Sequence, residues 1–171
     1  MITSSEPQPR PVAVLRRDRL LRRAGIVLLV LFVGAGASGL LGTRTAEVSG
    51  QGGGHELTVT YPSVTRSGHA VRLEVEVRRR GGFDGPVAVR LGSAYFDLFD
   101  ENAFDPTPTS HTSDGEHEVM LFDPPPGDTL VVSVDTRVEP ARQRGARGSA
   151  AVLDDAGRPV VDVQFRTRLL P

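Results

Sequence analysis

The chain has 171 residues and a formal net charge of −1, with no cysteine and no tryptophan. Without cysteine it can form neither disulfide bonds nor a lipid-modified cysteine anchor. All of its Lys and Arg positions are arginine, and charge divides along the chain. Residues 1–23 hold six arginines against two acids, whereas residues 44–171 hold fourteen arginines against nineteen acids. Because nucleic-acid binding needs a basic surface, the acidic C-terminal part argues against a nucleic acid as partner.

The N-terminal region predicts a membrane anchor. Residues 24–43 contain no charged residue, and at 1.5 Å rise per residue they match the ~30 Å hydrocarbon core of a bilayer. Arginine-rich flanks stay on the cytoplasmic side. We therefore expect a single-pass signal-anchor in the cell membrane, with residues 1–23 as a basic, disordered cytoplasmic tail and the rest of the chain outside.

A cleaved secretory signal is the alternative reading of this region. A basic stretch, an apolar core and small residues at Ala35-Gly36-Ala37 also fit a signal peptide with its cleavage site. Leu40 and Leu41 extend the apolar stretch beyond that site. This extension favours a retained helix, because it lets the segment complete the crossing.

The segment that follows is rich in glycine and predicts a linker. Residues 44–54 end in Ser49-Gly50-Gln51-Gly52-Gly53-Gly54, a composition typical of flexible chains. Eleven such residues reach about 20 Å, so we expect a short tether that keeps the following domain near the membrane. The globular domain is predicted to occupy residues 55–171.

This domain shows the period-two pattern of β-strands. In residues 71–78, valines and a leucine at odd positions alternate with Arg and Glu at even positions, as in a strand with one face on the core. Similar patterns mark about seven strands, within residues 57–61, 71–78, 87–91, 119–122, 130–138, 150–152 and 161–169. Short alternating strands separated by Gly/Pro-rich turns predict an all-β fold, an immunoglobulin-like β-sandwich.

Two segments resemble the entries to strands in bacterial immunoglobulin-like modules. They are Tyr61-Pro62-Ser63-Val64-Thr65-Arg66-Ser67-Gly68 and Pro126-Gly127-Asp128-Thr129, each of which precedes a long alternating strand. The resemblance spans residues 55–169, without the paired cysteines and core tryptophan of antibody-type domains. It implies a role in adhesion, spacing or assembly.

Residues 93–113, here called the aromatic–acidic segment, depart from the simple strand pattern. The segment interleaves four aromatic residues with four acids: Tyr95, Phe96, Phe99, Phe104, Asp97, Asp100, Glu101 and Asp105. Exposed aromatic rings would form a partner-binding patch. The carboxylates would instead supply the oxygen ligands that Ca²⁺ prefers, although their spacing matches no EF-hand loop. In the third reading Phe96, Phe99 and Phe104 cap the core and the acids face water.

Catalytic motifs are scarce. The sequence contains no G-x-S-x-G elbow, no phosphate-binding loop after a strand and no H-E-x-x-H pair, and nothing in it calls for a cofactor. We therefore expect a non-catalytic, membrane-anchored extracytoplasmic module that contacts another membrane or envelope protein. The alternative is a hydrolytic or carbohydrate-active enzyme, in which Asp84 and the acids of residues 97–105 would supply paired carboxylates.

Overall fold

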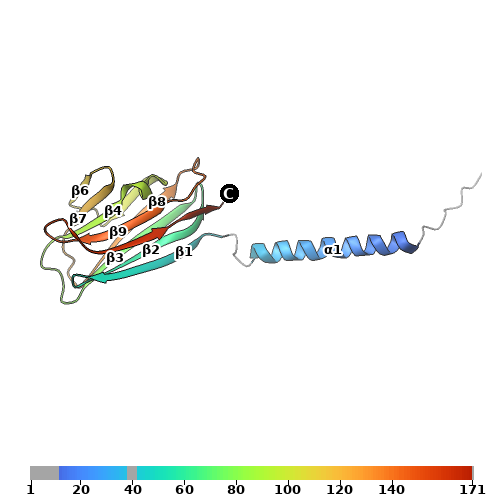
Figure 1. The fold of residues 1–171 in the computed structure, drawn as a ribbon, viewed down its shortest axis with the longest axis horizontal. Helices are drawn as coiled ribbons and strands as arrows, with labels where there is room; N and C mark the ends of the chain where they lie inside the picture. The colour runs from blue at the N-terminus through green and yellow to red at the C-terminus, as the bar shows by residue number, and fades with distance from the viewer. Residues whose placement is uncertain (1–11, 38–41, 171) are drawn as a thin grey trace, which may run out of the picture. The chain divides into compact units, whose positions relative to one another are not determined.

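The computed structural model describes residues 12–37 and 42–170. The chain divides into two units, Met1–Gly42 and Thr43–Pro171, each of which is described by itself. The N-terminal unit contains helix α1 (Val12–Ala37), and the C-terminal unit is a β-sandwich (Figure 1).

Helix α1 begins earlier than the predicted span of residues 24–43. The prediction of disorder is therefore wrong for residues 12–23, where arginine and leucine favour helix and no proline follows Pro11. Within the described chain, Arg19–Ala37 is the one helical stretch long and apolar enough to cross a membrane, a test that signal sequences also pass. The large apolar side chains of this stretch are exposed. Residues 1–11 and 38–41 lie outside the described residues.

The C-terminal unit contains eleven strands among its described residues, arranged in two sheets. Sheet A has the strand order β1-β2-β3-β8-β5, and β11 also pairs with β2. Its strands are β1 (Arg44–Gly52), β2 (His55–Arg66), β3 (Ala70–Arg79), β5 (Phe99–Asp105), β8 (Thr129–Val138) and β11 (Arg168–Leu170). Sheet B has the order β10-β9-β4-β7-β6. Its strands are β4 (Val87–Gly92), β6 (Ser110–Ser113), β7 (His117–Phe122), β9 (Arg147–Leu153) and β10 (Pro159–Arg166). The predicted all-β sandwich is confirmed, with more strands than the seven expected.

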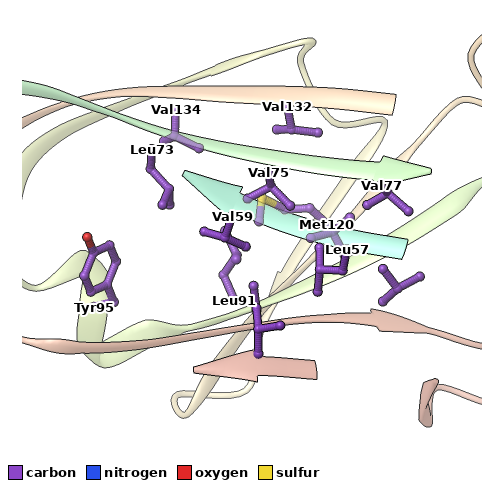
Figure 2. Close-up of a cluster of buried hydrophobic side chains, with 14 of the residues drawn as sticks. Leu57, Val59, Leu73, Val75, Val77, Leu91, Tyr95, Met120, Val132 and Val134 are labelled. Atoms are coloured by element: carbon purple, nitrogen blue, oxygen red, sulfur yellow. The ribbon is translucent and has the colours of Figure 1, made fainter. Parts of the chain in front are cut away.

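The core lies between the two sheets and is built from the alternating residues. Leu73, Val75 and Val77 of β3 are buried, as the period-two pattern predicts. The register of sheet A places Val59 of β2 and Val132 of β8 on either side of Val75. Figure 2 shows these side chains meeting Leu91 and Met120 of sheet B. Their burial removes apolar surface from water and supplies the main stabilisation of the fold.

The predicted flexible tether over residues 44–54 is wrong, because residues 44–52 form strand β1. This strand pairs with β2 along its whole length, with Val48 opposite Val59. The glycines of β1 allow this strand to pack closely against β10, and they do not mark a flexible linker. A Cβ at Gly52 would lie 2.1 Å from the carbonyl oxygen of Val160, and one at Gly50 would lie 3.0 Å from a methyl of Val163. Residues without side chains are therefore needed where β1 closes over β10.

Candidate functional site

The aromatic–acidic segment forms the short helix α2 (Ser93–Phe96) and strand β5. Two of its four predicted partner-binding rings are buried: Tyr95 is 2% exposed and Phe99 is 7% exposed. Tyr95 packs edge-on against Phe99 and Phe165, with ring centroids 5.2 and 4.9 Å away. The prediction of an exposed contact patch is wrong for Tyr95 and Phe99, since both belong to the core.

The hydroxyl of Tyr95 makes a structural hydrogen bond. It lies 2.7 Å from Oγ1 of Thr167, which itself donates to the carbonyl oxygen of Pro62 at 2.6 Å. Because the single Thr167 proton is used on Pro62, Tyr95 is the donor in the first bond. Burial raises the pKa of Tyr95 to about 12, so the hydroxyl keeps its proton. From the sequence, Tyr95 was noted only as one of four aromatic residues in the segment. Nothing in the sequence indicated that its ring lies in the core.

Phe96 and Phe104 are half-buried near the edge strands β5 and β6. Their ring centroids lie 6.1 Å apart, and Phe104 also meets the imidazole of His111 edge-on at 5.9 Å. Both rings pack against the core on one side. Their role in partner binding stays a prediction.

The acids of the segment do not converge where the structure describes them. Asp97, Asp100 and Asp105 are exposed, and the side chain of Glu101 lies outside the described residues. In the described part of the chain, no three His, Asp or Glu side chains are grouped to hold a metal. The predicted calcium site therefore stays a prediction.

The carboxylates proposed for hydrolysis lie at opposite ends of a strand. Asp84 precedes β4 and forms an ion pair with Arg79 at 2.7 Å, whereas Asp97 follows β4 and α2. The six residues of β4 alone span about 20 Å. Paired carboxylates of glycosidases stand about 5–10 Å apart. Asp84 and Asp97 therefore do not form such a pair.

A hydrogen-bonded cluster surrounds Glu118, and it was not predicted from the sequence. The carboxylate accepts bonds from Ser113 Oγ at 2.7 Å and Ser93 Oγ at 2.9 Å, and lies 2.8 Å from Nε2 of His111. Burial alone would raise the pKa of Glu118, but these three hydrogen bonds together lower it below its usual value. Both hydroxyls bond to the carboxylate and not to the imidazole. The cluster thus joins β6, β7 and the start of α2, and it lacks the serine–imidazole bond of a catalytic triad.

The outer face of sheet A is the most distinctive surface of the sandwich. It carries Val131, the one large hydrophobic side chain of the described residues 42–170 that is exposed, at 41%. Six carboxylates share this face with three guanidinium groups: Glu47, Glu56, Glu74, Glu76, Asp105 and Asp135 with Arg72, Arg78 and Arg137. The face is therefore acidic around a small apolar centre.

Two of these six acids have no hydrogen-bond, ion-pair or other electrostatic partner among the described residues and are free to meet another protein. Arg72 pairs with Asp135 at 2.7 Å, and Arg78 pairs with Asp128 at 3.4 Å. Glu47 and Glu76, by contrast, form no hydrogen bond or ion pair with any described residue. The strand register aligns Glu47, Thr60, Glu74, Ser133 and Asp105 in one row across five strands. At ~4.8 Å between strands, this row is about 19 Å long.

Comparisons with known proteins assign no family. No family model and no curated protein matches the chain. Among solved structures, the chain is similar to the CaDoc0917–CaCohA2 complex, with 10% identity over 63% of this chain and 94% of that one and a TM-score of 0.37. It is also similar to a non-cellulosomal cohesin from Archaeoglobus fulgidus, with 14% identity over 75% and 92% of the two chains and a TM-score of 0.32. The DNA glycosylase AlkC of Pseudomonas fluorescens matches at 14% identity, with a TM-score of 0.32 and only 28% of its length covered. None of these likenesses is close enough to indicate a function.

Proposed function

We propose that this protein is a non-catalytic, membrane-anchored module that binds another membrane or envelope protein through the outer face of sheet A. The observation that carries the proposal is the group of carboxylates on the face that also carries exposed Val131; two of them, Glu47 and Glu76, have no hydrogen-bond or ion-pair partner in the described chain. A solvated sheet surface usually balances its charges across strands, and here the acids outnumber the arginines.

The chemistry of this face defines the partner. Unpaired carboxylates favour a surface that presents Lys or Arg, and Val131 favours a small apolar contact at its centre. Five strands cover about 24 Å, and the ten residues of β3 cover about 33 Å. The face is therefore close in area to the ~800 Å² that each partner contributes to a standard interface.

Helix α1 supports a location at the extracytoplasmic surface of the cell membrane. Its apolar stretch follows an arginine-rich segment, which predicts an N-terminus in the cytoplasm. Six residues lie between Ala37 and Arg44, where β1 begins, and the chain between these two residues cannot extend beyond about 25 Å. The partner would therefore lie close to the membrane.

A photo-activated cross-linker at position 131 tests the proposal in the full-length chain in native membranes. We expect cross-linking to a single protein at a surface rich in Lys and Arg. The double variant Glu74→Arg/Glu76→Arg should reduce the yield about tenfold or more, because it replaces attraction by repulsion at the centre of the interface.

The matched control is Glu116→Arg/Asp155→Arg, which reverses two exposed acids outside this face. It should leave the cross-linking yield unchanged. Equal losses in the two double variants, or full yield in the first, would contradict an interface on sheet A. Both variants should keep the melting temperature of the parent chain, because surface substitutions change stability little.

A further inference from the structure

Arginines gather at the end of the sandwich where β1 begins. Arg44 of β1 and Arg168 of β11 both pair with Val64 of β2, so the start of β1 and the end of the chain lie together (Figure 1). In sheet B, Arg147 and Arg166 are direct cross-strand neighbours. We call this group the basic end; it comprises Arg66, Arg142, Arg144, Arg147, Arg166 and Arg168.

Five of the six arginines of the basic end lack an ion-pair partner among the described residues. The exception is Arg142, whose Nε forms a long ion pair with a carboxylate oxygen of Glu139 at 3.9 Å, too far for a hydrogen bond. Like charges placed directly opposite each other in a sheet, such as Arg147 and Arg166, repel. The basic end therefore holds unneutralised positive charge in a domain whose net charge is negative.

The opposite end of the sandwich shows the usual arrangement. Three of its four arginines each pair with an aspartate: Arg78 with Asp128, Arg79 with Asp84 and Arg158 with Asp154, at 3.4, 2.7 and 2.9 Å. Most arginines at this end are thus paired with aspartates, whereas most arginines of the basic end have no ion-pair partner among the described residues. The unpaired charge of the basic end is therefore the feature that needs an explanation.

A groove of 690 Å³ opens at the basic end. Arg66 and Arg142 line it together with His69, Leu169 and Leu170. The Nε atoms of both arginines are buried and have no hydrogen-bond acceptor among the described residues. Buried donors are normally satisfied, and the oxygens of an anion would be strong acceptors for them.

We propose that the basic end binds the phosphate groups of anionic phospholipids on the outer surface of the membrane that anchors the chain. The inference rests on the proposed anchor, because the six residues between Ala37 and Arg44 can span no more than about 25 Å. Guanidinium groups match phosphate oxygens in bidentate geometry. The apolar Leu169 and Leu170 beside them suit the boundary between headgroups and acyl chains.

Energy transfer between a dye on the sandwich and labelled lipid headgroups tests this proposal. The full chain, which has no native cysteine, is placed in nanodiscs with a dye at Gln143→Cys or, as the control position, at Asp155→Cys in the opposite end. Transfer from position 143 should rise when phosphatidylglycerol replaces phosphatidylcholine, and high salt should reverse the rise. Transfer from position 155 should stay low.

The triple variant Arg147→Gln/Arg166→Gln/Arg168→Gln should lower the fraction of chains whose basic end contacts the lipid headgroups about tenfold or more. The reason is that each basic residue near an anionic surface adds attraction. Arg78→Gln/Arg158→Gln, at the opposite end, should leave this fraction unchanged. Equal transfer in both lipids would overturn the proposal. The proposal would also be overturned if millimolar inorganic phosphate, at constant ionic strength, abolished the increase in energy transfer from position 143. The site would then bind free phosphate and not the lipid.

Membrane anchoring by helix α1 is tested separately in the same samples, by alkaline extraction. A chain that stays with the nanodiscs after alkaline extraction but shows no lipid-dependent transfer overturns the basic-end proposal alone. A chain that leaves the nanodiscs on extraction overturns the anchor, and with it the proposed function.

Discussion

Replacing Leu73 by alanine should lower the free energy of unfolding by about 2–5 kcal/mol. Leu73 is 1% exposed and lies in the middle of β3, between the two flanking strands of sheet A and against sheet B (Figure 2). The substitution removes buried apolar surface and leaves a cavity that the surrounding residues fill only in part. Denaturant unfolding of the full chain in detergent gives the difference.

The matched control is Glu74→Ala, the next residue along the same strand. Glu74 points to the outer face of sheet A, and its removal should change stability by no more than about 0.5 kcal/mol. Comparable losses at both positions would mean that the core-facing residues of β3 are not Leu73, Val75 and Val77, which Figure 2 shows in the core.

Replacing Gly52 by alanine should destabilise the sandwich by about 1–3 kcal/mol or more. The new Cβ would lie 2.1 Å from the carbonyl oxygen of Val160, a backbone atom that cannot turn aside. Strand β1 would have to move away from β10 and expose the core between them. Thermal unfolding monitored by circular dichroism measures the loss.

Gly85→Ala provides the control for this substitution. No heavy atom lies within 4 Å of a Cβ built at Gly85, and its backbone does not adopt the left-handed conformation. The melting temperature of Gly85→Ala should match that of the parent chain or exceed it slightly. An unchanged melting temperature for Gly52→Ala would instead support the flexible linker that the composition of residues 44–54 suggests.

The strands that were predicted from sequence are those with clear alternation. β3, β4, β8 and β10 bury every second side chain along most of their length, and this period is visible in the sequence alone. β1 was missed because its glycines gave it the composition of a linker. Whether a glycine serves flexibility or close approach depends on the neighbouring strand, which is about a hundred residues away in the case of Val160.

The candidate site was predictable only in part. The charged face of residues 72–78 follows from alternation, but its extension to Glu47 and Asp105 depends on strand pairing across sheet A. The burial of Phe99 was one of three readings of its segment and that of Tyr95 was not predicted, because α2 and the start of β5 interrupt the period-two pattern that would have decided it. The basic end was hidden for a similar reason: its arginines are distant in sequence, and the net charge of the domain is negative.

Both proposals depend on a single membrane crossing with the sandwich outside, and cysteine accessibility in intact cells measures this directly. Because the chain has no native cysteine, single substitutions can be labelled with a membrane-impermeant maleimide. We expect Asp155→Cys to react in intact cells, Ser4→Cys to react only after the cells are permeabilised, and the full-length mass to persist in the membrane fraction. A mature protein that begins near Ser38, or a Ser4→Cys chain labelled in intact cells, would contradict the account.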